Sequence, residues 1–141
     1  LKLHKPLKGQ GFLLLSADTV VAFKGKTYGK PQSEVEATHL LSALSGNMHS
    51  VITALFIQDI DQEVKVLRTC ESQIWFRDLS EQEIHDYVAT GEPFDKAGGY
   101  GIQGLAHSFV TQWQGSYSNI VGLPMELLEE LEKQYEWQIR F

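Results

Sequence analysis

One carboxylate stands inside an otherwise apolar segment near the beginning of the chain. Asp18 lies in the run S-A-D-T-V-V, within the segment 11–23, whose leucines, valines and phenylalanines predict a buried strand. A carboxylate that is shielded from solvent needs a partner, a metal ion or a raised proton affinity. Asp18 is therefore a candidate for catalysis or metal binding. The alternative is a strand-end aspartate that caps a neighbouring backbone amide.

A glycine-rich stretch, residues 95–104 with the sequence D-K-A-G-G-Y-G-I-Q-G, is the second region suited to chemistry. Gly98 and Gly99 allow the backbone to approach a ligand and to point amides at phosphate oxygens. Three glycines of the stretch also spell G-x-G-x-x-G. We reject a dinucleotide site, because that fingerprint requires a preceding strand and a following helix. The alternative is a solvated loop, for which a tyrosine and an isoleucine are poor residues.

Cations lie close to these two stretches. Lys96 is part of the glycine-rich stretch, and Lys30 lies on a tight turn, Gly29-Lys30-Pro31, after the first expected strand. Taken singly, a lysine on a turn or an arginine at a strand end, such as Arg77, is ordinarily solvated surface. The histidines share no zinc-ligand spacing, so zinc is not expected.

The elements that must position these residues form an irregular α/β alternation. Residues 48–57 and 64–76 predict an antiparallel hairpin, and Ser33 and Ser80, each followed three residues later by a glutamate, predict capping boxes that open helices. The other expected elements are a strand over 109–113, a helix with Pro124 as its first residue, and a last strand over 137–141. The sum predicts a mixed α/β domain.

Composition limits the class of protein. The 141 residues fit one domain, 1–141, and carry a formal net charge of −6, which argues against a general nucleic-acid binder. No apolar run approaches the roughly 20 residues of a membrane-spanning helix, so no membrane association is expected. Cys70 is the single cysteine and cannot form an internal disulfide, which favours a cytoplasmic protein.

Several short motifs, taken together, resemble the Maf family. They occur here in the family's order and span roughly residues 14–131: A-D-T-V-V at 17–21, G-K-P at 29–31, L-S-G at 44–46 with His49, F-R at 76–77, Y-V at 87–88 with G-E-P at 91–93, D-K-A-G at 95–98 with Y-G-I-Q-G at 100–104, G-S-Y at 115–117, and V-G-L-P at 121–124. The resemblance implies an elongated α/β fold, with a mixed sheet flanked by helices and a cleft between two lobes, related to the inosine triphosphate pyrophosphatases.

The resemblance also implies a function. Family members cleave nucleoside triphosphates between the α- and β-phosphates with a divalent metal, Mg²⁺ or Mn²⁺. Asp18 matches the family's general base and would also hold the metal, whereas Lys30 and Lys96 match phosphate-binding lysines. Thr19 and Gln103 match positions linked to substrate choice, and the Y-G-I-Q-G form resembles the branch that acts on dTTP and UTP. A homodimer is compatible with this resemblance.

One part of the family pattern is not found. Nothing before Phe12 matches the family's S-x-S-P-R-R phosphate loop, so we expect this chain to lack the N-terminal strand and phosphate loop of the family. Two other functions therefore stay open beside a pyrophosphatase. One is a non-catalytic nucleotide-binding or division-regulatory protein, and the other is a structural or interaction domain without a ligand.

Overall fold

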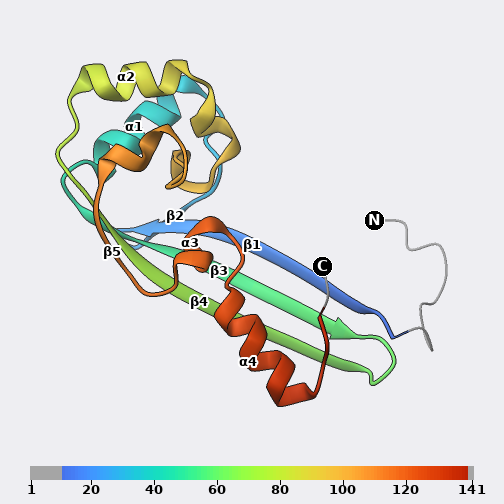
Figure 1. The fold of residues 1–141 in the computed structure, drawn as a ribbon. Coiled ribbons are helices and arrows are strands. Elements are labelled where there is room, and N and C mark those ends of the chain that lie inside the picture. The colour runs from blue at the N-terminus through green and yellow to red at the C-terminus, as the bar shows by residue number, and fades with distance from the viewer. Residues whose placement is uncertain (1–10, 140–141) are drawn as a thin grey trace.

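A long antiparallel sheet is the framework of residues 11–139, the part of the chain that the computed structural model describes (Figure 1). Its strand order is β2-β1-β3-β4-β5. The strands are β1 (Leu13–Phe23), β2 (Lys26–Tyr28), β3 (Met48–Asp59), β4 (Val64–Phe76) and β5 (Val110–Gln114). All four strand pairings are antiparallel, so the sheet expected as mixed is antiparallel throughout the described residues. The predicted hairpin of β3 and β4 is confirmed.

The two faces of the sheet differ in burial. Along β3 the odd-numbered residues from His49 to Asp59 are buried, whereas the even-numbered residues between them are half-buried. Successive side chains of a strand point to opposite faces, so one face carries the core and the other is more open. Directly paired residues of neighbouring strands share a face. The register therefore assigns each residue of β1 to a face.

Helices gather at one end of the sheet. They are α1 (Glu34–Leu44) and α2 (Glu81–Ala89), which pack on each other and on β1, β3 and β4 through one apolar cluster that includes Leu41, Ile74 and Tyr87 (Figure 1). The capping box predicted at Ser80 is confirmed in both of its hydrogen bonds. At Ser33 only half of it forms, because the Glu36 carboxylate accepts from the amide of Gln32 rather than from that of Ser33.

Residues 92–109, which include the glycine-rich stretch, form three short 3-10 helices between α2 and β5. These are η1 (Glu92–Asp95), η2 (Ala97–Gly99) and η3 (Leu105–Phe109). The chain then forms β5, the short helix α3 (Tyr117–Val121) and α4 (Met125–Tyr135). We predicted Pro124 to be the first residue of this helix, whereas it is the N-cap, one position before the first helical residue.

A second apolar cluster lies along the other half of the sheet. Leu128 and Leu131 of α4 pack there on Leu55, Ile57 and Val66 of the sheet, so the molecule has two lobes that share β1, β3 and β4 (Figure 1). This confirms the α/β class and the helices that flank the sheet.

The strand predicted over 137–141 is wrong for its described part. Residues 137–139 form no strand, because the indole of Trp137 turns back to donate to Asp59 Oδ2 at 2.8 Å and the amide of Ile139 donates to Glu132. Residues 140 and 141 lie outside the described residues, as do residues 1–10, on which the expected lack of a phosphate loop depends. Within residues 11–139, no helix is long and apolar enough to cross a bilayer.

Candidate active site

A pocket of about 280 Å³ lies where the two lobes meet. Five of the predicted site residues line it: Asp18, Thr19, Lys30, Lys96 and Gln103. The structure therefore brings together side chains from β1, from the turn after β2 and from the glycine-rich stretch. A second hollow is lined mainly by Glu129, Glu132 and Glu136 around Lys133 and Trp137. That acidic lining is unsuited to a polyanion.

Asp18 is exposed, which corrects the expectation of a shielded carboxylate. Residues 16–18 are the exposed part of β1, because β2 pairs only with residues 21–23 and leaves the outer edge of the earlier residues without a neighbouring strand among those described. The register pairs Asp18 with Ala54 and Thr19 with Thr53, so the two side chains leave β1 on opposite faces. The pocket thus reaches around an open strand edge.

Gly98 holds the glycine-rich stretch against β1. Its amide donates to the carbonyl of Gly29 at 3.0 Å, and its backbone is left-handed, with φ +73°. A Cβ at this position would lie 2.2 Å from Val21 Cγ2. Only glycine fits, and the close approach brings the loop with Lys96 to the turn with Lys30.

The two lysines have different surroundings. Lys30 Nζ lies 3.6 Å from Asp95 Oδ1, and both side chains are largely exposed, at 60% and 81%. Lys96 is exposed and has no ion-pair partner among residues 11–139, and its aliphatic part runs beside Gly101, whose Cβ would meet Lys96 Cε at 3.3 Å. Lys96 is therefore the more available cation for an anionic ligand.

The amides of Gly98 and Gly99 do not form the predicted phosphate cradle. The amide of Gly98 donates to Gly29, and that of Gly99 donates to the carbonyl of Lys96 at 3.0 Å. Both residues are buried, and neither lines the pocket. We predicted a close approach of these glycines to a ligand, whereas in the structure Gly98 approaches β1 and the turn after β2.

Glu92 organises the loop that carries Gln103, a role that sequence reasoning missed. Its carboxylate accepts from Tyr87 Oη at 2.9 Å and from the amide of Leu105 at 3.2 Å. A Cβ on Gly104 would lie 2.2 Å from Glu92 Oε1, so a side chain there would displace this carboxylate from its present position. The sequence signal that could have indicated this role is the glutamate of the G-E-P motif, which is Glu92. Gln103 itself is exposed and makes no hydrogen bond within residues 11–139.

A further wall of the pocket comes from α3, which sequence reasoning also missed as part of the site. Ile120, Val121 and Gly122 line the pocket. Asn119, fully buried, fixes this helix by donating from Nδ2 to the carbonyl of Val51 at 3.1 Å and to Ser72 Oγ at 3.0 Å.

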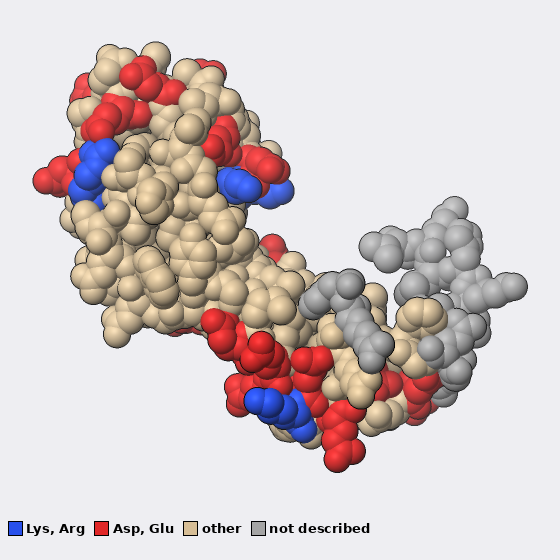
Figure 2. All heavy atoms as spheres, viewed as in Figure 1, with Lys and Arg blue, Asp and Glu red and all other residues tan. Residues whose placement is uncertain are grey.

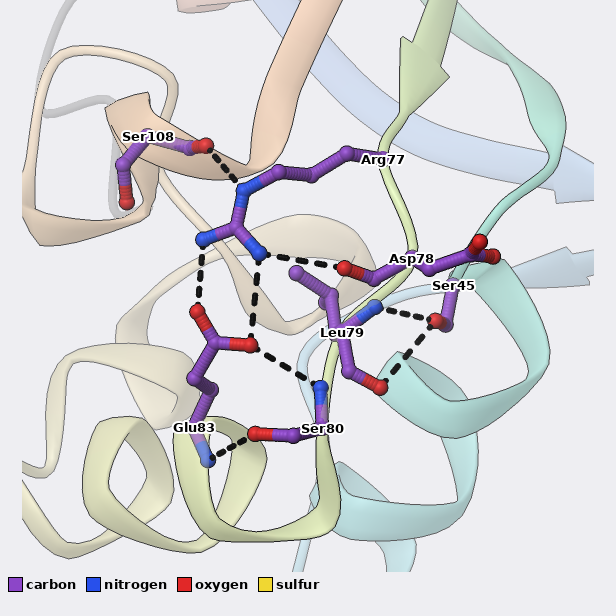
Figure 3. A network of polar contacts seen from close by, with 7 residues as sticks. All are labelled: Ser45, Arg77, Asp78, Leu79, Ser80, Glu83 and Ser108. Carbon is purple, nitrogen blue, oxygen red and sulfur yellow. Dashed lines mark hydrogen bonds and ion pairs between the residues drawn. The ribbon is translucent and has the colours of Figure 1, made fainter.

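Arg77 lies outside the pocket, in a structural network (Figure 3). Its guanidinium donates to both carboxylate oxygens of Glu83, at 2.7 and 3.2 Å, and its Nε donates to the carbonyl of Ser108 at 2.8 Å. These bonds tie the end of β4 to α2 and to η3. Hydrogen bonding from Arg77 lowers the pKa of the Glu83 carboxyl to about 2.

The pocket holds few metal-binding groups of its own. No cluster of three or more His, Cys, Asp or Glu occurs within residues 11–139. Asp95 is engaged with Lys30, whereas Asp18 has no ion-pair partner there. One free carboxylate fits a Mg²⁺ ion of the kind that is bound by one or two carboxylates together with substrate phosphates. It does not fit a metal site built from protein ligands alone.

The Maf-like protein family model matches residues 2–135, so the chain belongs to this family. It is 52% identical over 122 residues to the dTTP/UTP pyrophosphatase of Photorhabdus laumondii, covering 86% of this chain and 62% of that protein. It is 50% identical over 113 residues to the protein of the same name from Syntrophomonas wolfei, covering 80% of this chain and 60% of the relative. The chain thus spans about 60% of the length of these curated relatives.

Proposed function

We propose that this protein is a nucleoside triphosphate pyrophosphatase that hydrolyses dTTP or UTP to the monophosphate and pyrophosphate. The observation that carries the proposal is one pocket that unites Asp18, a carboxylate without an ion-pair partner among residues 11–139, with Lys30 and Lys96. The names of the relatives, dTTP/UTP pyrophosphatase, support this choice of reaction and substrate.

The proposed reaction is an attack of water on the α-phosphorus. A P–O bond forms as the bond to the pyrophosphate oxygen breaks, and negative charge develops on that leaving oxygen. Asp18, as general base, takes the proton that the attacking water loses. Its exposure at an open strand edge leaves room for the water. Lys96 and Lys30 would stabilise the charge of the phosphates and of the leaving pyrophosphate.

A divalent cation belongs to this proposal. Mg²⁺ or Mn²⁺ held by Asp18 and by the phosphates would neutralise phosphate charge and lower the pKa of bound water. The protein's own contribution is to keep this carboxylate free of the neighbouring lysines. Lys30 lies 3.6 Å from Asp95, and neither Lys30 nor Lys96 forms an ion pair with Asp18.

Base recognition would fall to Gln103 and Thr19. The amide of Gln103 offers a donor and an acceptor, which is what the edge of a uracil or thymine ring requires. Both residues line the pocket with the lysines, so the proposed phosphate and base contacts would lie within one cavity.

We propose a small-molecule substrate in the cytoplasm rather than a nucleic-acid partner. The exposed surface of α4 carries three glutamates, Glu126, Glu129 and Glu130, against one lysine, Lys133, and Figure 2 shows acidic side chains gathered on this part of the molecule. Such a surface repels nucleic acid. A single cysteine, Cys70, supports a reducing compartment.

Pyrophosphate release tests the proposal. The protein would be incubated with UTP, dTTP, CTP and GTP, with and without Mg²⁺, and pyrophosphate and monophosphate would be quantified. We expect equal amounts of both products from UTP and dTTP, only with the metal. Release of orthophosphate would point to a different bond. Binding of UTP without any cleavage would support the non-catalytic nucleotide-binding role instead.

A further inference from the structure

A chain of hydrogen bonds runs from the pocket into the core. Thr19 Oγ1 lies 2.9 Å from Thr53 Oγ1, and Thr53 Oγ1 donates to the backbone carbonyl of Asn119 at 3.3 Å. Thr53 is fully buried, so its hydroxyl finds its partners only within the protein.

The chain has a direction. Each hydroxyl carries one proton, and Thr53 donates its proton to the carbonyl of Asn119. Thr53 must therefore accept in its contact with Thr19, and Thr19 is the donor. The opposite orientation would give one hydrogen bond among these three groups instead of two, and the carbonyl of Asn119 would keep only the amide of Gly122 as its donor.

The end of the chain is fixed in place. The Asn119 side chain donates to the carbonyl of Val51 and to Ser72 Oγ, and the Asn119 carbonyl also accepts from the amide of Gly122 at 3.0 Å. Because these bonds hold α3 against β3 and β4, the carbonyl that orients Thr53 cannot turn away without breaking them.

The Thr19 hydroxyl is accessible from the pocket. Thr19 lines the pocket and is half-buried. A Cβ on Gly122 would lie 3.7 Å from Thr19 Oγ1, so the missing side chain leaves room beside this oxygen. Since its proton is directed at Thr53, Thr19 presents only lone pairs to a ligand.

We propose that Thr53 acts as a positioning residue that makes Thr19 a hydrogen-bond acceptor in the pocket, so that the site favours a pyrimidine with an N3–H donor over one with an N3 acceptor. Uracil and thymine carry that donor, whereas cytosine carries an acceptor. This inference rests on the proposed function and explains how its substrate would be distinguished from CTP.

Affinities of uncleavable analogues test the inference apart from catalysis. Dissociation constants of α,β-methylene-UTP and α,β-methylene-CTP would be measured by calorimetry for the wild type, Thr53→Val and Thr53→Ser. Valine keeps the shape of threonine and removes the acceptor, so the Thr19 proton becomes free to face the ligand. We expect the preference for the uracil analogue to fall about tenfold in Thr53→Val, the size of one hydrogen bond, and to be retained in Thr53→Ser.

The outcomes separate the two claims. An unchanged preference in Thr53→Val overturns the inference, because a structural effect alone would weaken the binding of both analogues alike. A loss of preference in Thr53→Ser equal to that in Thr53→Val also overturns it, because serine keeps the hydroxyl. Thermal unfolding of both variants shows whether they are folded at the calorimeter's temperature. An unfolded Thr53→Val would be replaced by Thr19→Val, which removes the Thr19 oxygen that would accept from the ligand and should lower the preference for the uracil analogue as well. Binding of the uracil analogue without pyrophosphate release from UTP contradicts the proposed function but not the inference. A wild type that binds neither analogue contradicts both.

Discussion

The amide of Gly98 donates to the carbonyl of Gly29 at 3.0 Å, and this hydrogen bond joins the two loops that carry the lysines of the pocket. The contact is possible because Gly98 has no side chain against Val21. Two lysines separated by some seventy positions in the sequence thereby come together at the edge of β1.

Gly98→Ala should destabilise the protein. The new methyl group would overlap Val21 Cγ2, and the left-handed backbone at φ +73° is strained for alanine. We expect a loss of about 2–4 kcal/mol in the free energy of unfolding, measured by urea denaturation. Gly91→Ala is the matched control, because its φ is +79° but a Cβ there meets nothing within 4 Å. Equal losses in both variants would show that packing against Val21 contributes nothing.

The ion pair of Glu83 with Arg77 predicts a loss of stability in acid. The pKa of the Glu83 carboxyl is lowered from 4.5 to about 2 in the folded protein. The stabilisation that this carboxylate contributes is therefore complete above pH 4.5 and is lost as pH falls towards 2. Glu83→Gln should remove this part of the pH dependence. Urea denaturation at several pH values measures it, with Glu81→Gln in the same helix as control. A Glu83→Gln slope like that of the wild type between pH 4.5 and 2 would contradict the assignment.

His49 predicts a second loss of stability, at higher pH than that of Glu83. Burial lowers its pKa from 6.5 to about 4, so the unfolded chain binds more protons between these values and stability falls as pH drops from 6.5 to 4. At about 1.4 kcal/mol per pKa unit the loss is roughly 3 kcal/mol. His49→Gln should flatten this slope whatever its own stability, whereas the exposed His39→Gln should not. If both variants keep the wild-type dependence of stability on pH between 6.5 and 4, His49 is not the source of that dependence.

Gln103→Glu should change base preference more than metal dependence. A carboxylate only accepts hydrogen bonds, so it loses the donor that the amide offers to a pyrimidine edge. We expect the ratio of kcat/KM for UTP over GTP to fall by about tenfold, the value of one hydrogen bond. Gln112→Glu on β5, outside the pocket, controls for added charge. If selectivity is the same in both variants, Gln103 does not recognise the base.

Local patterns in the sequence predicted local structure well. The β3–β4 hairpin follows from two apolar runs around a polar turn, and the capping box at Ser80 follows from the serine and glutamate spacing. Both depend on residues that are close in sequence. The α/β class followed from the same information.

The exposure of Asp18 and the engaged amides of Gly98 and Gly99 were not predictable in this way. The exposure of Asp18 depends on which strand lies beside β1, and the partners of the two amides depend on which backbone lies against the glycines. Both features are contacts between segments that are distant in sequence. The motif match gave roles to five residues of the pocket. The hydrogen bonds by which Glu92 and Asn119 fix its loops became visible only with the tertiary contacts.

The most direct test of the account is pyrophosphate release from UTP with Mg²⁺ by the wild type and by Asp18→Asn, with Asp86→Asn on α2 as a control for the loss of one charge. Loss of a general base should lower kcat roughly 100- to 10,000-fold, about 3–5 kcal/mol of barrier, while Asp86→Asn stays at the wild-type rate. Equal rates for wild type and Asp18→Asn would contradict the role of this carboxylate and, with it, the proposed mechanism.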